Sequence, residues 1–304
     1  MKVEQIPGIS LSQVCSLSGY SRQAYYKRRL VKTREPVKED QLIQEVIAYR
    51  ELMPRLGGRK LLFLMKPFMK KHQLSVGRDC FFRILGRHGL LNKKRRGKPR
   101  TTDSNHWMRK YPDLIRKLIL TGSKQLWVSD ITYLDLCDEH VYLSLITDAY
   151  SRKIVGFHVS ASLGADGCIK AMEMATLGRN KEDKLIHHSD RGTQYCCDDY
   201  IELLQHHKVD ISMTQTGDPR DNAIAERVNG ILKMELLKQV FIDLEDARKD
   251  VAQAINIYNY LRPHSSLSML TPALVHAGKV TIKPERLWKN HYKKMPGKEM
   301  VPAG

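Results

Sequence analysis

The spacing of apolar residues changes near residue 124, from helical periodicity before it to strand-like runs after it. Three such runs follow one another with short breaks, at residues 126–136, 140–150 and 153–162. Short β-rich runs joined by brief connections are typical of an antiparallel meander. We therefore expect the first three strands of a sheet here.

Helical and strand-like segments alternate after this meander. Strands separated by helices run parallel in one sheet, so the order predicts an α/β layer fold with a mixed five-stranded sheet. We expect this core at residues 120–240, followed by a C-terminal helix and a basic tail at 241–304. The expected segments are a helix at 164–179, a strand at 184–190, a helix at 198–208, a strand at 209–215, a long helix at 218–237 with Asp221 or Asn222 as its cap, and a helix at 244–261.

The first 34 residues have the spacing of a helix-turn-helix. Leu11, Val14 and Leu17 would line one face of a first helix, Gly19 would allow the turn, and Ser21 would cap a second helix. Amphipathic helix pairs also occur in helical domains that do not bind DNA. The basic residues expected to contact DNA from the second helix are Arg22, Arg28 and Arg29.

A second basic helical module is expected at residues 36–100. The pair Glu35-Pro36 predicts a break before it, since proline disfavours a helix interior. Residues 74–91 resemble the second half of a helix-turn-helix, with Ser75 as the cap. The basic linker that follows either lies along DNA phosphates or is a flexible tether. Its candidate contacts are Lys93, Lys94, Arg95 and Arg96.

Charge is distributed unevenly along the chain. Residues 1–110 contain 26 Lys and Arg but 8 Asp and Glu, whereas residues 111–304 contain 25 of each kind. The formal net charge of +18 therefore resides in the first third. A basic module joined to a neutral one predicts a nucleic-acid partner, although a solvated basic surface would have the same composition.

Other classes of function find little support in the sequence. No apolar stretch is long enough for a membrane span, and the first residues lack a signal core, so we expect a cytoplasmic, nucleoid-associated protein. The six cysteines form no CxxC pair, and His72, Cys80 and His88 are spaced unlike zinc ligands. A phosphate-binding loop for a nucleotide cofactor is missing from the sequence.

Three carboxylates occur where a folded core disfavours charge. Asp130 lies inside the first strand-like run, Asp190 ends the fourth, and 35 residues separate Asp190 from Glu226 on the expected long helix. Neighbouring strands and a helix across the sheet can bring the three together, and a cation then offsets their repulsion. Oxygen ligands favour Mg²⁺, with Mn²⁺ as a substitute. The pattern predicts two ions about 4 Å apart, a geometry suited to phosphoryl displacement.

Polar residues recur along the expected helix at 218–237. Asn222, Glu226, Asn229 and Lys233 are spaced by four, three and four residues and so share one face. That face is either catalytic and DNA-binding, with Asn229 and Lys233 as contacts, or simply solvated. Three further candidates have structural alternatives: Asp148 as a turn carboxylate, and His187 and His188 as core histidines.

Five ordered motifs in the second half of the chain resemble a known family, and the similarity extends over about residues 10–276. The motifs are WVSDITYL, SLITDAYSRKIVGF, HSDRGTQY, DNAIAERVNGILKMEL and YNYLRPHSSLSMLTP. They resemble the OrfB-type transposases of the IS-three insertion-sequence family. This resemblance implies a retroviral-integrase-like, ribonuclease-H-like core with an Asp-Asp-Glu triad at Asp130, Asp190 and Glu226, and Lys233 as a DNA contact. It also implies DNA cleavage and strand transfer, the activity of a polynucleotidyl transferase.

The resemblance also implies partners. They are transposon ends, target DNA and further copies of the chain, and members of the family often act as a frameshift fusion with an upstream frame. A sustained heptad repeat is not found before residue 120, so the chain resembles the downstream frame. Two other functions stay open: a plain nuclease of the same fold, and a DNA-binding regulator without catalysis.

Overall fold

The computed structural model describes residues 10–92, 108–116, 118–137, 139–215, 222–278 and 280, with only the backbone described at 27–38. The chain forms two compact units. One comprises Met1–Glu51 and Leu64–Leu91, and the other comprises Leu52–Phe63 and Asn92–Gly304. We call them the helical unit and the sheet unit.

The helical unit begins with the expected pair of helices, α1 (Leu11–Leu17) and α2 (Arg22–Leu52). Gly19 adopts the left-handed conformation with φ +69°, and the Ser21 hydroxyl accepts a hydrogen bond from the Ala24 N–H at 3.1 Å, so both predicted turn residues are confirmed. Leu17, expected on the same helix face as Leu11 and Val14, is 86% exposed. Cys15, which lies one helical turn after Leu11, is buried instead.

Two other boundaries differ from the expectation. Helix α2 continues through Pro36, so the predicted break at Glu35-Pro36 was wrong. An interior proline costs about 3 kcal/mol, which strong helix formers on both sides can offset. Helix α4 (Arg78–Arg87) is capped by Gly77 rather than by Ser75, because the helix starts two residues later than the pattern indicated.

Helices α2, α3 (Gly58–Lys71) and α4 supply the core of the helical unit. Its fully buried side chains include Leu42, Val46, Met65, Phe81 and Leu85. At its surface, Glu39 of α2 accepts hydrogen bonds from Arg87 at 2.7 Å and pairs with His88 at 3.0 Å. These contacts join α2 to the C-terminal end of α4.

The sheet unit is built on the mixed sheet that the sequence predicted. Strands β1 (Leu126–Leu136), β2 (His140–Asp148) and β3 (Ile154–Ser160) are antiparallel, whereas β4 (Ile186–Ser189) and β5 (Asp210–Met213) continue the sheet in parallel. The strand order is β3-β2-β1-β4-β5. A sixth strand, β6 (Val240–Phe241), was not predicted and pairs with the far end of β1.

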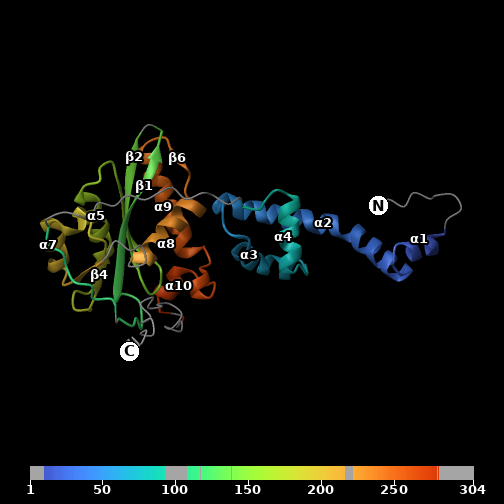
Figure 1. The fold of residues 1–304 in the computed structure, drawn as a ribbon, viewed down its shortest axis with the longest axis horizontal. Coiled ribbons are helices and arrows are strands. Elements are labelled where there is room, and N and C mark those ends of the chain that lie inside the picture. Colours follow the sequence, from blue (N-terminus) through green and yellow to red (C-terminus); the bar gives the residue numbers. More distant parts are fainter. Residues whose placement is uncertain are drawn as a thin grey trace, which may run out of the picture. The chain divides into compact units, whose positions relative to one another are not determined.

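Helices cover both faces of this sheet (Figure 1). The face toward Trp127 packs against α5 (Ala165–Thr176), α6 (Thr193–Cys196) and α7 (Asp198–His206). The face toward Leu126 and Val128 carries α8 (Ala223–Ile231) and residues near the short helices η3 (Ser265–Leu267) and α10 (Pro272–His276). Helix α9 (Leu244–Tyr260) packs along β3. Alternation along β1 therefore directs Asp130 toward α8.

The long helix expected at 218–237 is shorter and ends irregularly. Residues 216–221, including Asp221, lie outside the described part, and α8 is followed by a π-helical turn, η2 (Leu232–Leu236). The Leu237 N–H donates to the carbonyl of Leu232 at 2.8 Å, five residues back. Asn222 occupies the cap position, but its side chain makes no capping hydrogen bond.

Candidate active site

The pairing of β1 with β4 relates the positions of the first two carboxylates. These parallel strands pair Leu126 with Ile186 and Val128 with His188. Asp130 lies two residues beyond Val128, and Asp190 lies two residues beyond His188. Asp130 faces α8, and the register brings Asp190, just beyond the end of β4, level with it on the neighbouring strand.

Helix α8 lies across β1 and carries Glu226 to the same face. The Asn222 Nδ2 donates to the Ser129 carbonyl at 2.7 Å, and the Asn229 Nδ2 donates to Asp130 Oδ2 at 2.9 Å. Glu226 lies four residues after Asn222 and three before Asn229, so it shares their side of the helix. The predicted polar stripe thus exists, but its two asparagines face β1.

The three carboxylates are each half-buried, and the two aspartates accept local hydrogen bonds. Asp130 Oδ1 accepts from the N–H of Ile131 at 3.0 Å, and Asp190 Oδ1 accepts from the N–H of Gly192 at 3.0 Å. Among the described residues, no three His, Cys, Asp or Glu side chains lie close enough together to hold a metal ion. The three carboxylates therefore come from β1, the end of β4 and α8, and they do not form a closed cluster within the described part of the chain.

The predicted DNA contacts fall into three groups. Lys233 lies in η2, where its ammonium donates to the Tyr133 carbonyl at 2.6 Å and to Thr132 Oγ1 at 3.3 Å, both on β1. The side chain of Arg22 is exposed at the start of α2. The side chains of Arg28 and Arg29, and the whole of Lys93, Lys94, Arg95 and Arg96, lie outside the described residues.

Comparison with known proteins identifies the family. Two models described as integrase core domains match residues 121–219 and 207–272. The uncharacterized 31 kDa protein of insertion element IS600 from Shigella sonnei is 31% identical over 265 residues, covering 86% of this chain and 96% of that protein. The transposase InsF of insertion sequence IS3A from Escherichia coli is 28% identical over 274 residues, covering 86% and 92%. The chain belongs to the IS-three family of transposases.

Two of the solved structures similar to the transposase come from a viral intasome and a viral integrase. A chain of the simian T-cell lymphotropic virus intasome in complex with a PP2A regulatory subunit has 16% identity and a TM-score of 0.45, covering 82% of this chain and 74% of that one. The catalytic core domain of HTLV-2 integrase, in complex with magnesium, has 17% identity and a TM-score of 0.40, covering 51% and 97%. Within the described ranges of the transposase, no helix has the length and apolar character of a membrane span.

A buried histidine lies beneath the carboxylates of the transposase, on the opposite face of the sheet. The His187 Nε2 lies 2.6 Å from Ser129 Oγ and 3.0 Å from the Tyr200 hydroxyl. Complete burial, and secondarily the charge of His188, lower the pKa of His187 to about 3. His187 is therefore a neutral core histidine, the structural alternative left open by the sequence.

Asp148 is likewise structural. Its Oδ1 accepts from the Ser151 N–H at 2.8 Å and from the Ser151 hydroxyl at 2.7 Å, while Oδ2 accepts from the Lys124 N–H at 2.6 Å. The carboxylate is completely buried. It fixes the turn between β2 and β3, as the position before that turn suggested.

The sequence did not predict a cluster of three charged side chains centred on Glu235, which belongs to η2. Glu235 Oε2 accepts two hydrogen bonds from Arg262, at 2.9 and 2.8 Å, and Oε1 accepts one from Lys60 at 3.1 Å. The pKa of Lys60 is lowered, first by burial and then by the charge of Arg262. Nothing in the local pattern distinguishes these residues from surface charges, because they come from three distant parts of the sequence.

Proposed function

We propose that this transposase cleaves and joins DNA strands with Asp130, Asp190 and Glu226 as its catalytic carboxylates. The observation that carries the proposal is the attachment of α8 to β1 through Asn222 and Asn229, at 2.7 and 2.9 Å, beside Asp130. Glu226 lies between these two anchors. The substrates proposed are the ends of the element and a target DNA, bound by the basic first third of the chain.

The chemistry has two similar steps. Water attacks a phosphodiester at the element end and releases a 3′-hydroxyl, which then attacks a phosphodiester of the target. Each step exchanges one P–O bond for another, so a single site serves both. The integrase core solved with magnesium supports a divalent cation, and the all-oxygen donor set supports Mg²⁺ or Mn²⁺. Two ions held by the three carboxylates would activate the attacking oxygen and stabilise the departing one.

Asn229 takes a different role from the one its position in the sequence suggested. It is 5% exposed and donates to Asp130 Oδ2, so we propose that it orients the carboxylate rather than touching DNA. Because Asn229 already fixes the Asp130 carboxylate, that side chain loses less conformational entropy when the site binds its substrate. Lys233 is the member of the stripe proposed to engage the DNA end, by exchanging its contact with the Tyr133 carbonyl for a phosphate.

The test is metal-dependent nicking and joining of labelled element-end DNA by the purified chain. Asp130→Asn, Asp190→Asn and Glu226→Gln should each abolish both reactions in Mg²⁺ and Mn²⁺, with DNA affinity within about twofold of the parent because binding is assigned to residues 1–110. Glu245→Gln, at an exposed ion pair with Arg248, is the matched control and should keep activity. Triad variants that still cleave DNA would refute the assignment, and variants that lose DNA affinity would give the carboxylates a structural role.

DNA binding itself should weaken steeply with salt, as counterion release requires. Lys233→Ala should weaken engagement of the element end while leaving the melting temperature close to that of the parent, whereas normal activity in this variant would exclude Lys233 from the site. Members of the family act on DNA as assemblies, and we propose that copies of this chain assemble on the element ends. Binding without cleavage by the parent chain would instead favour a regulatory role or a requirement for an upstream-frame segment, which adding that segment would distinguish.

A further inference from the structure

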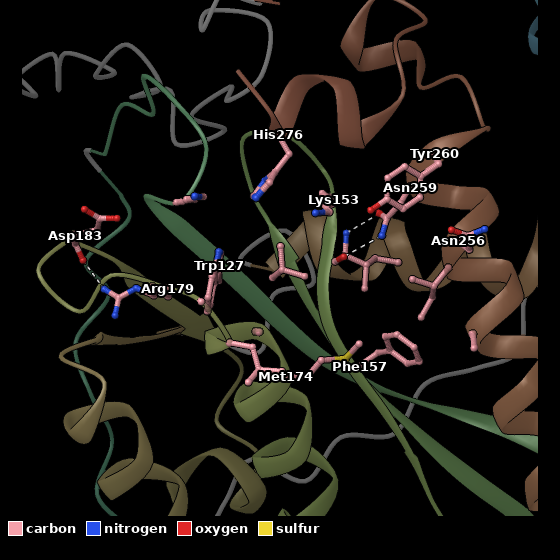
Figure 2. Close-up of a pocket in the computed structure, with 18 of the residues that line it drawn as sticks. Trp127, Lys153, Phe157, Met174, Arg179, Asp183, Asn256, Asn259, Tyr260 and His276 are labelled. Carbon is pink, nitrogen blue, oxygen red and sulfur yellow. Dashed lines mark hydrogen bonds between the residues drawn. The ribbon is translucent and has the colours of Figure 1, made fainter. Parts of the chain in front are cut away.

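The sheet unit contains a cavity of about 400 Å³ at the edge of the sheet formed by β3 (Figure 2). It lies between the start of β3, the end of α5 and the second half of α9. Its wall is partly polar and partly apolar, and the apolar side chains include Phe157, Met174, Leu177 and Ile255. A cavity of this size can hold a small organic molecule.

The indole N–H of Trp127 is a polar group at one end of this cavity. Trp127 is 3% exposed, and its Nε1 has no hydrogen-bond acceptor in the part of the chain that the structure describes. Figure 2 shows this nitrogen at the end of the ring turned toward His276 and Lys153. An unsatisfied buried donor costs about 1–3 kcal/mol, which a ligand acceptor would recover.

Two lysines lie at the same end. Lys124 and Lys153 line the cavity, and neither ammonium forms an ion pair or hydrogen bond within the described ranges. The backbone of Lys124 is fixed, because its N–H is bound by Asp148 at 2.6 Å. Both ammonium groups are therefore available to a ligand in the cavity.

The remaining charges of the cavity do not neutralise the two lysines. Arg179 donates to the backbone carbonyl of His207 at 2.6 Å and to that of Asp183, so its charge is already engaged. Among the described lining residues, Asp183 is the one carboxylate. The polar end of the cavity therefore carries a net positive charge beside an apolar wall.

We propose that this cavity binds a small organic anion with an acidic head group and an apolar body. The head group accepts the indole N–H and pairs with Lys124 and Lys153, and the body contacts the apolar wall. A carboxylate, sulfonate or phosphate head meets these requirements, whereas DNA offers phosphates without an apolar body. The site is separate from the three carboxylates, none of which lines the cavity.

The probe is 8-anilinonaphthalene-1-sulfonate, an aromatic anion whose fluorescence rises in dry apolar surroundings. The full chain should bind it at one saturable site. Lys124→Met/Lys153→Met should weaken binding about tenfold or more, since charge-assisted hydrogen bonds contribute about 1.5–3 kcal/mol. Trp127→Phe, which keeps the ring and removes the donor, should weaken it about fivefold. Lys170→Met, an exposed lysine of α5 that does not line the cavity, should bind like the parent.

A neutral relative of the probe, N-phenyl-1-naphthylamine, separates charge recognition from apolar binding. It should bind the parent about tenfold more weakly than the sulfonate and should not distinguish the parent from the double lysine variant. Equal affinities for the two probes, or equal sulfonate affinities in the parent and the lysine variant, would overturn the proposal. Displacement of the sulfonate by duplex DNA would also overturn it, because the lysines would then belong to a DNA surface. Circular dichroism of each variant verifies folding, and all of them should retain strand cleavage.

Discussion

Replacing Glu235 should lower the free energy of unfolding of the sheet unit more than replacing an exposed acidic residue does. Glu235 accepts two hydrogen bonds from Arg262, whose side chain is 1% exposed, and one from Lys60. Glu235→Ala leaves both cations facing each other without their shared anion. Removing one partner of a buried ion pair typically costs about 3–5 kcal/mol.

The accessibility of the cluster narrows this range. The side chains of Glu235 and Lys60 are 17% and 12% exposed, so water can partly compensate for the lost anion. We therefore expect about 3 kcal/mol for Glu235→Ala, at the lower end of the range. Glu235→Gln keeps an acceptor for Arg262 but loses the charge, and should cost about 1–2 kcal/mol. Adding Lys60→Met to Glu235→Ala should restore part of the loss by removing one of the two facing cations.

The measurement is urea unfolding followed by circular dichroism, with stability compared through the midpoint at constant slope. Glu245→Ala is the control, because its ion pair with Arg248 is 65% and 42% exposed and should contribute less than about 1 kcal/mol. Equal losses for Glu235→Ala and Glu245→Ala would refute the reasoning. So would a double variant that is less stable than Glu235→Ala alone.

Three further predictions concern the sheet unit. Gly156→Ala should lower the free energy of unfolding by about 2 kcal/mol or more, because the new Cβ would lie 2.1 Å from the Ala171 carbonyl oxygen. The control Gly57→Ala has open space around its new Cβ, so its stability should stay within about 1 kcal/mol of the parent in the same unfolding assay. Asp148→Ala removes the acceptor of three hydrogen bonds from a buried turn and should lower the melting temperature, whereas an unchanged value would contradict the turn role. The pKa of His187 is lowered to about 3, so the unfolded chain binds a proton first as pH falls below about 6.5, and stability is lost. Between pH 7 and 5 this loss should reach about 2 kcal/mol, and His187→Gln should show a correspondingly smaller pH dependence of unfolding.

Much of the sheet could be predicted because its strands alternate or run continuously apolar. The first run matches β1 at both ends, Leu126 and Leu136, and the antiparallel and parallel parts follow from the connections. Strand β6 was missed because two residues, Val240 and Phe241, carry no periodicity. The end of α8 was missed because a π-helical turn has almost the same composition as an α-helix.

The candidate site was only partly predictable. Periodicity placed Asn222, Glu226, Asn229 and Lys233 on one side of a helix, but it does not specify what that side faces. Packing of α8 against β1 decides this, and it gives Asn229 a carboxylate as partner. The ion pairs of Glu235 with Lys60 and Arg262 could not be predicted, because the three residues are remote in sequence.

The membership of residues 52–63 in the sheet unit bears on how this protein can be divided. A fragment cut to residues 120–240, the limits that periodicity suggests for the catalytic core, would discard both Lys60 and Arg262 and leave Glu235 with neither cation. It would also lose Arg55, which donates to the carbonyl of Leu237 just beyond the π-helical turn. Such a fragment would keep all three carboxylates and yet lack the groups that hold the end of the helical segment that carries Glu226. A faithful minimal core has to include residues 52–63, which lie in sequence between the two segments of the helical unit, so the two units are interleaved in sequence rather than arranged one after the other.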